Sequence, residues 1–267
     1  MNCINISHII KNSDSKLLKS LPDFVIKIIV KIFRQKELNR TINKCSDYDG
    51  IDFMTKFLEE LNIKVEIDGQ ENLPENGKCI FVANHPFGLL DGVILTTIVG
   101  NKYKQIKIIG NEALTFIPNL QSIIANVSVF GKNPQKYFIE LNKVFASDTP
   151  IIHFPFGLVS RIHKFKIQDK SWKKSFITKA VANQRDVVPI RFYGRNSNLF
   201  YVVYIFRQIL NIKLKIELAL FPREMFKKKG KSIKVKIGKP ISYNVFKKSL
   251  SHTEWAQEVR NQVYKLN

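Results

Sequence analysis

The stretch that decides the fold is residues 79–92, which read Cys-Ile-Phe-Val-Ala-Asn-His-Pro-Phe-Gly-Leu-Leu-Asp-Gly. Five apolar residues open it, a run typical of a strand buried on both faces. The residues from Asn84 to Gly88 form turns or restrict the backbone, so we expect the strand to end there. From Leu89 the apolar side chains recur at the spacing of one helix face. The stretch therefore predicts a strand, a short loop and a helix.

Two side chains of this stretch suit proton transfer. His85 falls at the carboxyl end of the strand and Asp91 in the first turn of the helix, and open α/β sheets bind ligands at that edge. A carboxylate beside a histidine fixes the ring tautomer and stabilises the imidazolium, as a general base requires. The alternative is that Asp91 only complements the helix dipole and that His85 is an ordinary turn residue. The residues alone leave both readings open.

Residues 84–92 resemble the His/Asp box of the glycerol-phosphate and lysophospholipid acyltransferase superfamily. They are most similar to its bacterial branch of hemolysin-like and 1-acylglycerol-phosphate acyltransferase-like proteins. The resemblance implies that His85 and Asp91 are catalytic and that Asn84 and Gly88 line the substrate site. The usual box has four residues between His and Asp, whereas this one has five. One extra residue on a continuous helix would turn the carboxylate by about 100°, but Pro86 and Gly88 allow a loop to absorb it.

A second block, residues 154–161, reads Phe-Pro-Phe-Gly-Leu-Val-Ser-Arg. It resembles the superfamily's Phe-Pro-Glu-Gly-Thr-Arg-Ser signature and the Phe-Pro-Ala-Gly-x-x-Ser-Arg form of the closer branch. Phe156 replaces the Glu or Ala, so any role of that Glu is absent. A guanidinium can grip a phosphate or carboxylate through two hydrogen bonds; the alternative is a strand-terminating turn with a surface arginine. The resemblance implies a substrate site that includes Phe154, Pro155, Gly157, Ser160 and Arg161.

A third block follows the predicted strand 187–192, where Gly-Arg-Asn-Ser resembles the closer branch. Arg195 and Asn196 then add donors to the substrate site; a polar turn without function is the alternative. Between the His/Asp box and the Phe-Pro-x-Gly signature, the superfamily often carries an Arg that binds glycerol phosphate. The corresponding residues of this chain, 110–118, contain no Arg. The departure disfavours glycerol phosphate and favours a lysolipid or an acylated amino acid as the acceptor.

The order of elements predicts a single α/β domain, with a largely parallel mixed sheet flanked by helices. An N-terminal amphipathic helical segment precedes it. The expected strands are residues 64–67, 79–83, 106–109, 127–130, 150–154, 187–192 and 233–237. The expected helices are residues 16–38, 51–61, 89 onward, 137–146, 172–183 and 252–266, with short helices in 113–125 and a strand and helix in 199–221.

The N-terminal region has the pattern of an interfacial anchor. Residues 16–38 place Leu, Ile and Phe on one face with lysines at its flanks, and the apolar run 24–33 is too short to span a bilayer. We therefore expect residues 1–48 to form a membrane-surface segment and residues 49–267 the acyltransferase domain. The alternative is a helix packed on the domain. No signal-peptide pattern is present, so we expect a peripheral protein on the cytoplasmic face of the inner membrane.

The charge of the chain suits anionic partners. Its net charge is +21, from 43 basic and 22 acidic residues, and part of this reflects the lysine-rich usage of an AT-rich genome. The remainder fits a phospholipid surface, acyl carrier protein, coenzyme A or nucleic acid. No nucleic-acid recognition motif stands out, so nucleic acid is not an expected partner. The three cysteines show no pairing or metal spacing, and we expect a reducing compartment.

These observations together predict a membrane-surface O-acyltransferase. It would move a fatty acyl group from a thioester of acyl carrier protein or coenzyme A to the hydroxyl of a lysophospholipid or lyso-aminolipid. Because a thiolate leaves readily, the prediction includes no metal and no cofactor beyond the thioester co-substrate. The alternatives are a non-catalytic lipid-surface or hemolysin-like protein and, third, a nucleic-acid-binding protein.

Overall fold

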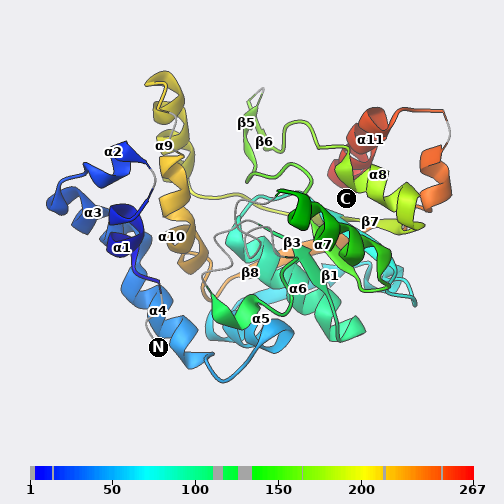
Figure 1. Cartoon of the computed structure of the whole chain (residues 1–267), viewed down its shortest axis with the longest axis horizontal. Helices are drawn as coiled ribbons and strands as arrows, with labels where there is room; N and C mark the ends of the chain where they lie inside the picture. Colours follow the sequence, from blue (N-terminus) through cyan, green and yellow to red (C-terminus); the bar gives the residue numbers. More distant parts are fainter. Residues whose placement is uncertain are drawn as a thin grey trace.

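The computed structural model of the chain describes residues 4–13, 15–110, 117–125, 134–163, 165–212, 215–247 and 249–267. The strand predicted at 127–130 and residues 113–116 of the predicted short helices lie outside these residues, whereas residues 118–120 form a short 3₁₀ turn. A six-stranded sheet runs through the molecule (Figure 1). Its strands follow the order β1 (Lys64–Asp68), β8 (Ser232–Ile237), β7 (Asp186–Phe192), β2 (Cys79–Ala83), β4 (Ile151–His153) and β3 (Lys107–Ile109).

The sheet is mixed but largely parallel, because β7 and β8 form its only antiparallel pair among the described strands. β2 is central, and all five of its residues are buried. Phe81 and Ala83 belong to one core cluster, while Ile80 and Val82 belong to a second cluster. A strand that faces two cores needs apolar residues at every position. The predicted fold class is therefore confirmed.

Helices cover both faces of the sheet. α5 (Gly50–Glu60) and α6 (Leu89–Tyr103) bury their apolar residues in the first core, and α7 (Pro134–Ala146), α8 (Ser175–Asn183) and α11 (His252–Lys265) contribute to the second. The remaining helices are α9 (Asn198–Ile209), α10 (Phe221–Phe226) and the short 3₁₀ turns η1 (Gln70–Asn72), η3 (Pro118–Leu120), η4 (Ile216–Leu220) and η5 (Tyr243–Lys247).

The described part of the N-terminal region forms four helices, α1 (Ile6–Lys11), α2 (Lys16–Lys19), α3 (Asp23–Phe33) and α4 (Gln35–Lys44). The prediction of one helix over residues 16–38 is therefore wrong. Pro22 precedes α3, and Arg34 takes a left-handed conformation with φ 57° that separates α3 from α4. Leu38 and Ile42 of α4 are buried in the first core. The domain boundary at residue 48 stays a prediction, but α4 packs as part of the core.

Two further segments differ from the prediction. An antiparallel hairpin, β5 (Arg161–His163) and β6 (Lys166–Gln168), follows the second motif and was not expected. Residues 199–221 were expected to hold a strand and a helix, but their described part is α9, η4 and the start of α10. In the described part of the chain, every helix is too short or too polar to cross a bilayer.

Candidate active site

The His/Asp box sits where β2 ends and α6 begins. Residues 84–88 form a loop outside the helix, and Gly88 at φ 82° precedes the first helical residue. This conformation suits glycine, because a side chain would be strained there. The loop absorbs the extra residue of the box, since His85 Nδ1 lies 2.9 Å from Asp91 Oδ2. The structure thus brings His85 and Asp91 together.

Asp91 is completely buried and is held by three donors. Its Oδ2 accepts hydrogen bonds from the backbone N–H groups of Phe87 at 2.8 Å and Gly88 at 2.9 Å, in addition to the His85 contact. Burial raises the pKa of the Asp91 carboxyl, and the hydrogen bonds oppose that rise. With Nδ1 donating to the carboxylate, the neutral His85 ring carries its lone pair on Nε2. The His85 side chain is 18% exposed, whereas that of Asp91 is 0% exposed.

The second motif, residues 154–161, packs directly against the His/Asp box. The ring of Phe154 stacks on His85 with centroids 4.1 Å apart. The Ser160 N–H donates to the His85 carbonyl at 2.8 Å, which joins the two loops through their backbones. Gly157 has φ 69° in the turn after Pro155. The structure therefore places Phe154 and Ser160 beside His85, as the sequence predicts for one site.

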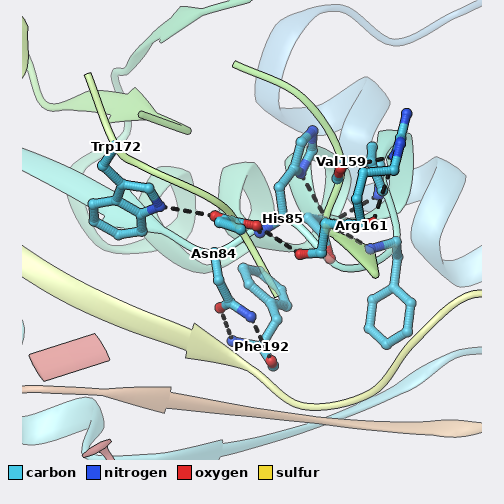
Figure 2. A network of polar contacts seen from close by, with 11 residues as sticks. Asn84, His85, Val159, Arg161, Trp172 and Phe192 are labelled. Atoms are coloured by element: carbon cyan, nitrogen blue, oxygen red, sulfur yellow. Dashed lines mark hydrogen bonds and ion pairs between the residues drawn. The ribbon is translucent and has the colours of Figure 1, made fainter. Parts of the chain in front are cut away.

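Asp169 was not selected from the sequence, because it stands apart from every motif. Its buried Oδ1 accepts from Ser160 Oγ at 2.6 Å and from the His85 N–H at 3.4 Å, and its Oδ2 accepts from Trp172 Nε1 at 2.9 Å. Figure 2 shows this chain of contacts running from Trp172 toward His85. Burial raises the pKa of the Asp169 carboxyl. Asp169 thus fixes the backbone on which His85 is mounted.

Asn84 is occupied by the neighbouring strand. Its Oδ1 accepts from the Phe192 N–H at 2.8 Å, and its Nδ2 donates to the Phe192 carbonyl at 3.0 Å (Figure 2). This pair of bonds ties the end of β2 to the end of β7. A substrate contact by the Asn84 side chain is therefore not part of the site that we describe.

Arg161 lies in a different environment from the one predicted. Its side chain is 3% exposed, donates to the Val159 carbonyl at 2.7 Å, and pairs with buried Glu217 at 3.0 Å. The guanidinium also lies over the rings of Phe200 and Tyr204. A headgroup ligand needs an accessible guanidinium, so this burial indicates a structural role for Arg161. The sequence pattern marks an arginine here but does not reveal its partner, which stands 56 residues later.

The third motif reaches the box from the side of Phe87. Gly194 has φ 130°, and a Cβ there would lie 2.4 Å from the Phe87 ring. The third motif and the box therefore touch at this point. Arg195 is exposed and contacts Asn198. Asn196 is buried, and its side-chain amide has no hydrogen-bond partner among the described residues. Both residues thus lie near the box, and their predicted substrate contacts stay a prediction.

Lys228 contacts both the third motif and the box. Its Nζ lies 4.8 Å from the centre of the Phe87 ring and donates to the Arg195 carbonyl at 2.9 Å. Burial lowers the pKa of Lys228. No motif of the sequence marks Lys228. The described residues include no group of three or more His, Cys, Asp or Glu that could hold a metal ion.

Comparisons with known proteins identify the family of the chain. A family model described as Acyltransferase matches residues 8–267. The chain belongs to this acyltransferase family. The predicted superfamily and enzyme class are therefore confirmed.

Two relatives of this family member are named lyso-glycine lipid O-acyltransferase. The protein from Phocaeicola vulgatus is 40% identical over 264 residues, which cover 98% of this chain and 95% of the relative. The protein from Bacteroides thetaiotaomicron is 38% identical over 264 residues, with 98% and 97% covered. The crystal structure of the 1-acyl-sn-glycerophosphate (LPA) acyltransferase PlsC from Thermotoga maritima aligns with 90% of this chain and 95% of its own, at 17% identity and a TM-score of 0.46.

Proposed function

We propose that this acyltransferase esterifies the free hydroxyl of a lyso-aminolipid, with His85 as the general base. The observation that carries the proposal is the 2.9 Å contact between His85 Nδ1 and buried Asp91. A histidine oriented by a carboxylate at the carboxyl end of a buried strand is arranged to remove a proton from a bound alcohol.

The reaction balances without a covalent enzyme intermediate. His85 Nε2 takes the hydroxyl proton while the alcohol oxygen attacks the thioester carbonyl. The tetrahedral intermediate collapses to an ester, and the leaving thiolate receives the proton from the imidazolium. Asp91 stabilises the imidazolium that exists between these two steps, because its carboxylate accepts from Nδ1.

The acceptor that we propose is a monoacylated glycine lipid with one free hydroxyl. The names of the two relatives, at 40% and 38% identity over nearly the whole chain, support this choice. A lysophospholipid is the related alternative, and the absence of an arginine from residues 110–118 argues against a glycerol phosphate headgroup. The acyl donor in the proposal is a thioester of acyl carrier protein or coenzyme A, both of which are anionic and suit a chain of net charge +21.

The experiment is a transfer assay with purified protein, a monoacylated glycine lipid, a lysophosphatidate and each thioester donor. We expect diacylated product from the glycine lipid, and we expect His85→Ala to lower the rate by at least about 10²-fold. His252→Ala, at the first residue of α11, is the control and should keep full activity. Transfer that survives in His85→Ala would contradict the mechanism, and preference for lysophosphatidate would contradict the acceptor.

A further inference from the structure

Helix α9 exposes a large apolar face to solvent, and the proposed reaction does not require one. One side of this helix is buried: Phe200 and Tyr201 belong to a core cluster, and Tyr204 is buried as well. The other side carries large apolar residues in solvent, Phe206 at 62% and Ile209 at 74% exposure among them. The members of this exposed face are Leu199, Val202, Ile205, Phe206, Ile209 and Leu210.

Two neighbouring elements also expose large apolar residues. α3 and α9 both pack on η4, and α3 exposes Phe24, Ile28 and Ile32. The β5–β6 hairpin packs on the same cluster as α9 through Ile162 and Ile167 and carries a fully exposed Phe165 near its tip. In Figure 1 the free end of α9 and the β5–β6 strands lie toward the same, upper side of the molecule. We call the exposed residues of α9, α3 and this hairpin tip the apolar rim.

Basic residues accompany the apolar rim. Lys27 and Lys31 lie beside the exposed face of α3, Lys166 follows Phe165, and Lys215 precedes η4, all of them exposed. Apolar side chains mixed with lysines match the boundary between headgroups and acyl chains of an anionic bilayer. A second copy of the chain would instead bring a like-charged surface against this one, which costs energy. Charge therefore favours a bilayer over self-association.

The apolar rim is coupled to the catalytic box through a buried ion-pair network. Glu217 of η4 pairs with Arg161 at 3.0 Å and with Arg207 of α9 at 2.9 Å. Arg161 directly follows Ser160, whose N–H is bonded to the His85 carbonyl. A bilayer that holds α9 would thus set the position of His85 relative to the lipid surface.

We propose that α9, flanked by α3 and the β5–β6 tip, is the surface on which the protein docks to an anionic bilayer. The apolar rim enters the headgroup boundary, and the lysines contact lipid phosphates. The proposal rests on the proposed function in one respect, that a lipid acceptor gives the enzyme a reason to dock.

The test compares two double variants of the full-length protein in sedimentation with phosphatidylcholine vesicles that contain phosphatidylglycerol. F206S/I209S removes two apolar side chains from the rim. V245S/L250S is the matched control, because both residues are exposed (42% and 41%) in or beside η5, an element that packs on α8. We expect F206S/I209S to bind vesicles at least about tenfold more weakly and V245S/L250S to bind like the wild type. Thermal unfolding of both variants should stay close to that of the wild type.

The other outcomes separate a failure of the docking proposal from a failure of the reaction proposal. Unchanged vesicle binding by F206S/I209S, or equal loss in the control, overturns the docking surface. A wild-type dimer that this variant dissociates in analytical ultracentrifugation, or a lost complex with acyl carrier protein while vesicle binding persists, overturns it in favour of a protein partner. Acyl transfer between short-chain substrates, dissolved below their micelle concentration, requires no lipid surface. It therefore tests the proposed reaction separately from docking. Its absence in the wild type would refute the proposed reaction and leave the vesicle result to judge the docking surface.

Discussion

Asp91 contacts the loop of residues 84–88 and the ring of His85 through the same carboxylate oxygen. Its Oδ2 accepts from two backbone N–H groups of the loop and from the His85 ring. Its Oδ1 is buried and has no hydrogen-bond partner among the described residues. The negative charge is therefore concentrated where an imidazolium would form. This arrangement separates two properties that mutation can test, the shape of the loop and the charge beside His85.

Asp91→Asn should remove the charge and keep the shape. The amide oxygen of Asn can still accept from Phe87 and Gly88, so the loop keeps its hydrogen bonds, whereas the imidazolium loses its counter-charge. We expect kcat to fall by about 10²–10⁴-fold, with a small change in KM for the acceptor and in the unfolding midpoint. Steady-state kinetics and urea unfolding measure the two effects.

Asp91→Ala is the companion variant, because it loses both the charge and the loop hydrogen bonds. We expect it to match the Asn variant in activity and to be less stable by about 2–4 kcal/mol, since the buried N–H groups of Phe87 and Gly88 lose their acceptor. An Asn variant that retains more than a tenth of wild-type kcat would argue against an electrostatic role for Asp91.

At the scale of elements, the site depends on how the ends of three strands are joined. Asn84 links β2 to β7 through two hydrogen bonds to the backbone of Phe192. Ser160 links the loop after β4 to the loop after β2 through the His85 carbonyl. Short polar bridges of this kind satisfy backbone groups that strand ends leave without a ladder partner. They also hold His85 and the third motif at a constant separation.

Asn84→Ala should therefore affect stability more than substrate binding. Two buried backbone groups of Phe192 lose their partners, and we expect the free energy of unfolding to fall by about 2–4 kcal/mol. Asn72→Ala is a matched control, because the Asn72 side chain donates one hydrogen bond to the Ile237 carbonyl, so its loss should be smaller. Urea unfolding checks both variants. A raised KM for the acceptor with unchanged stability would restore Asn84 to the substrate site.

The buried ring of His153, at the end of β4, should make the free energy of unfolding depend on pH. Burial lowers its pKa to about 4, below the usual value near 6.5. Between these two values the unfolded chain binds a proton that the folded chain does not, so stability decreases as the pH falls from about 6.5 to about 4. The contribution is up to about 3 kcal/mol. In His153→Asn the acid-side loss, measured by urea unfolding at a series of pH values, should become shallower; an unchanged slope would contradict this assignment.

The sequence predicted the elements whose patterns are local and strong. The buried run of β2, the helix from Leu89 and the final helix predicted at 252–266 were all identified, and the structure confirms them. These features depend on spacing within a few residues, which a sequence displays directly. The sequence left open whether His85 would reach Asp91 across five residues, and the structure answers this with a contact of 2.9 Å.

The features that the sequence did not reveal depend on distant partners. Arg161 has the residue type of a headgroup ligand, and only the position of Glu217 shows that it is buried and paired. Asp169 has no motif around it, and its role comes from Ser160 and Trp172, which fold onto it. The break at Arg34 was missed because helical spacing continues across it, whereas the packing of α4 in the core turns the chain.

At the scale of the whole molecule, charge and apolar surface act on the same side. The apolar rim lies beside exposed lysines, and the chain as a whole carries +21. Apolar insertion is insensitive to salt, whereas attraction between lysines and anionic lipid is screened within about 8 Å at physiological ionic strength. The two contributions to docking can therefore be separated by salt and by lipid composition.

The last prediction concerns the lysines of α3. K27Q/K31Q removes two charges beside the apolar rim, and at about 1 kcal/mol for each lysine we expect about 30-fold weaker binding to vesicles rich in phosphatidylglycerol at low salt. The difference from the wild type should shrink at high salt and vanish on pure phosphatidylcholine. K239Q/K265Q changes the net charge equally at exposed positions at the end of β8 and in the last turn of α11, and it should bind like the wild type. If both variants weaken binding to the same extent, the net charge of the chain, and not the position of the rim, would determine its attraction to the bilayer.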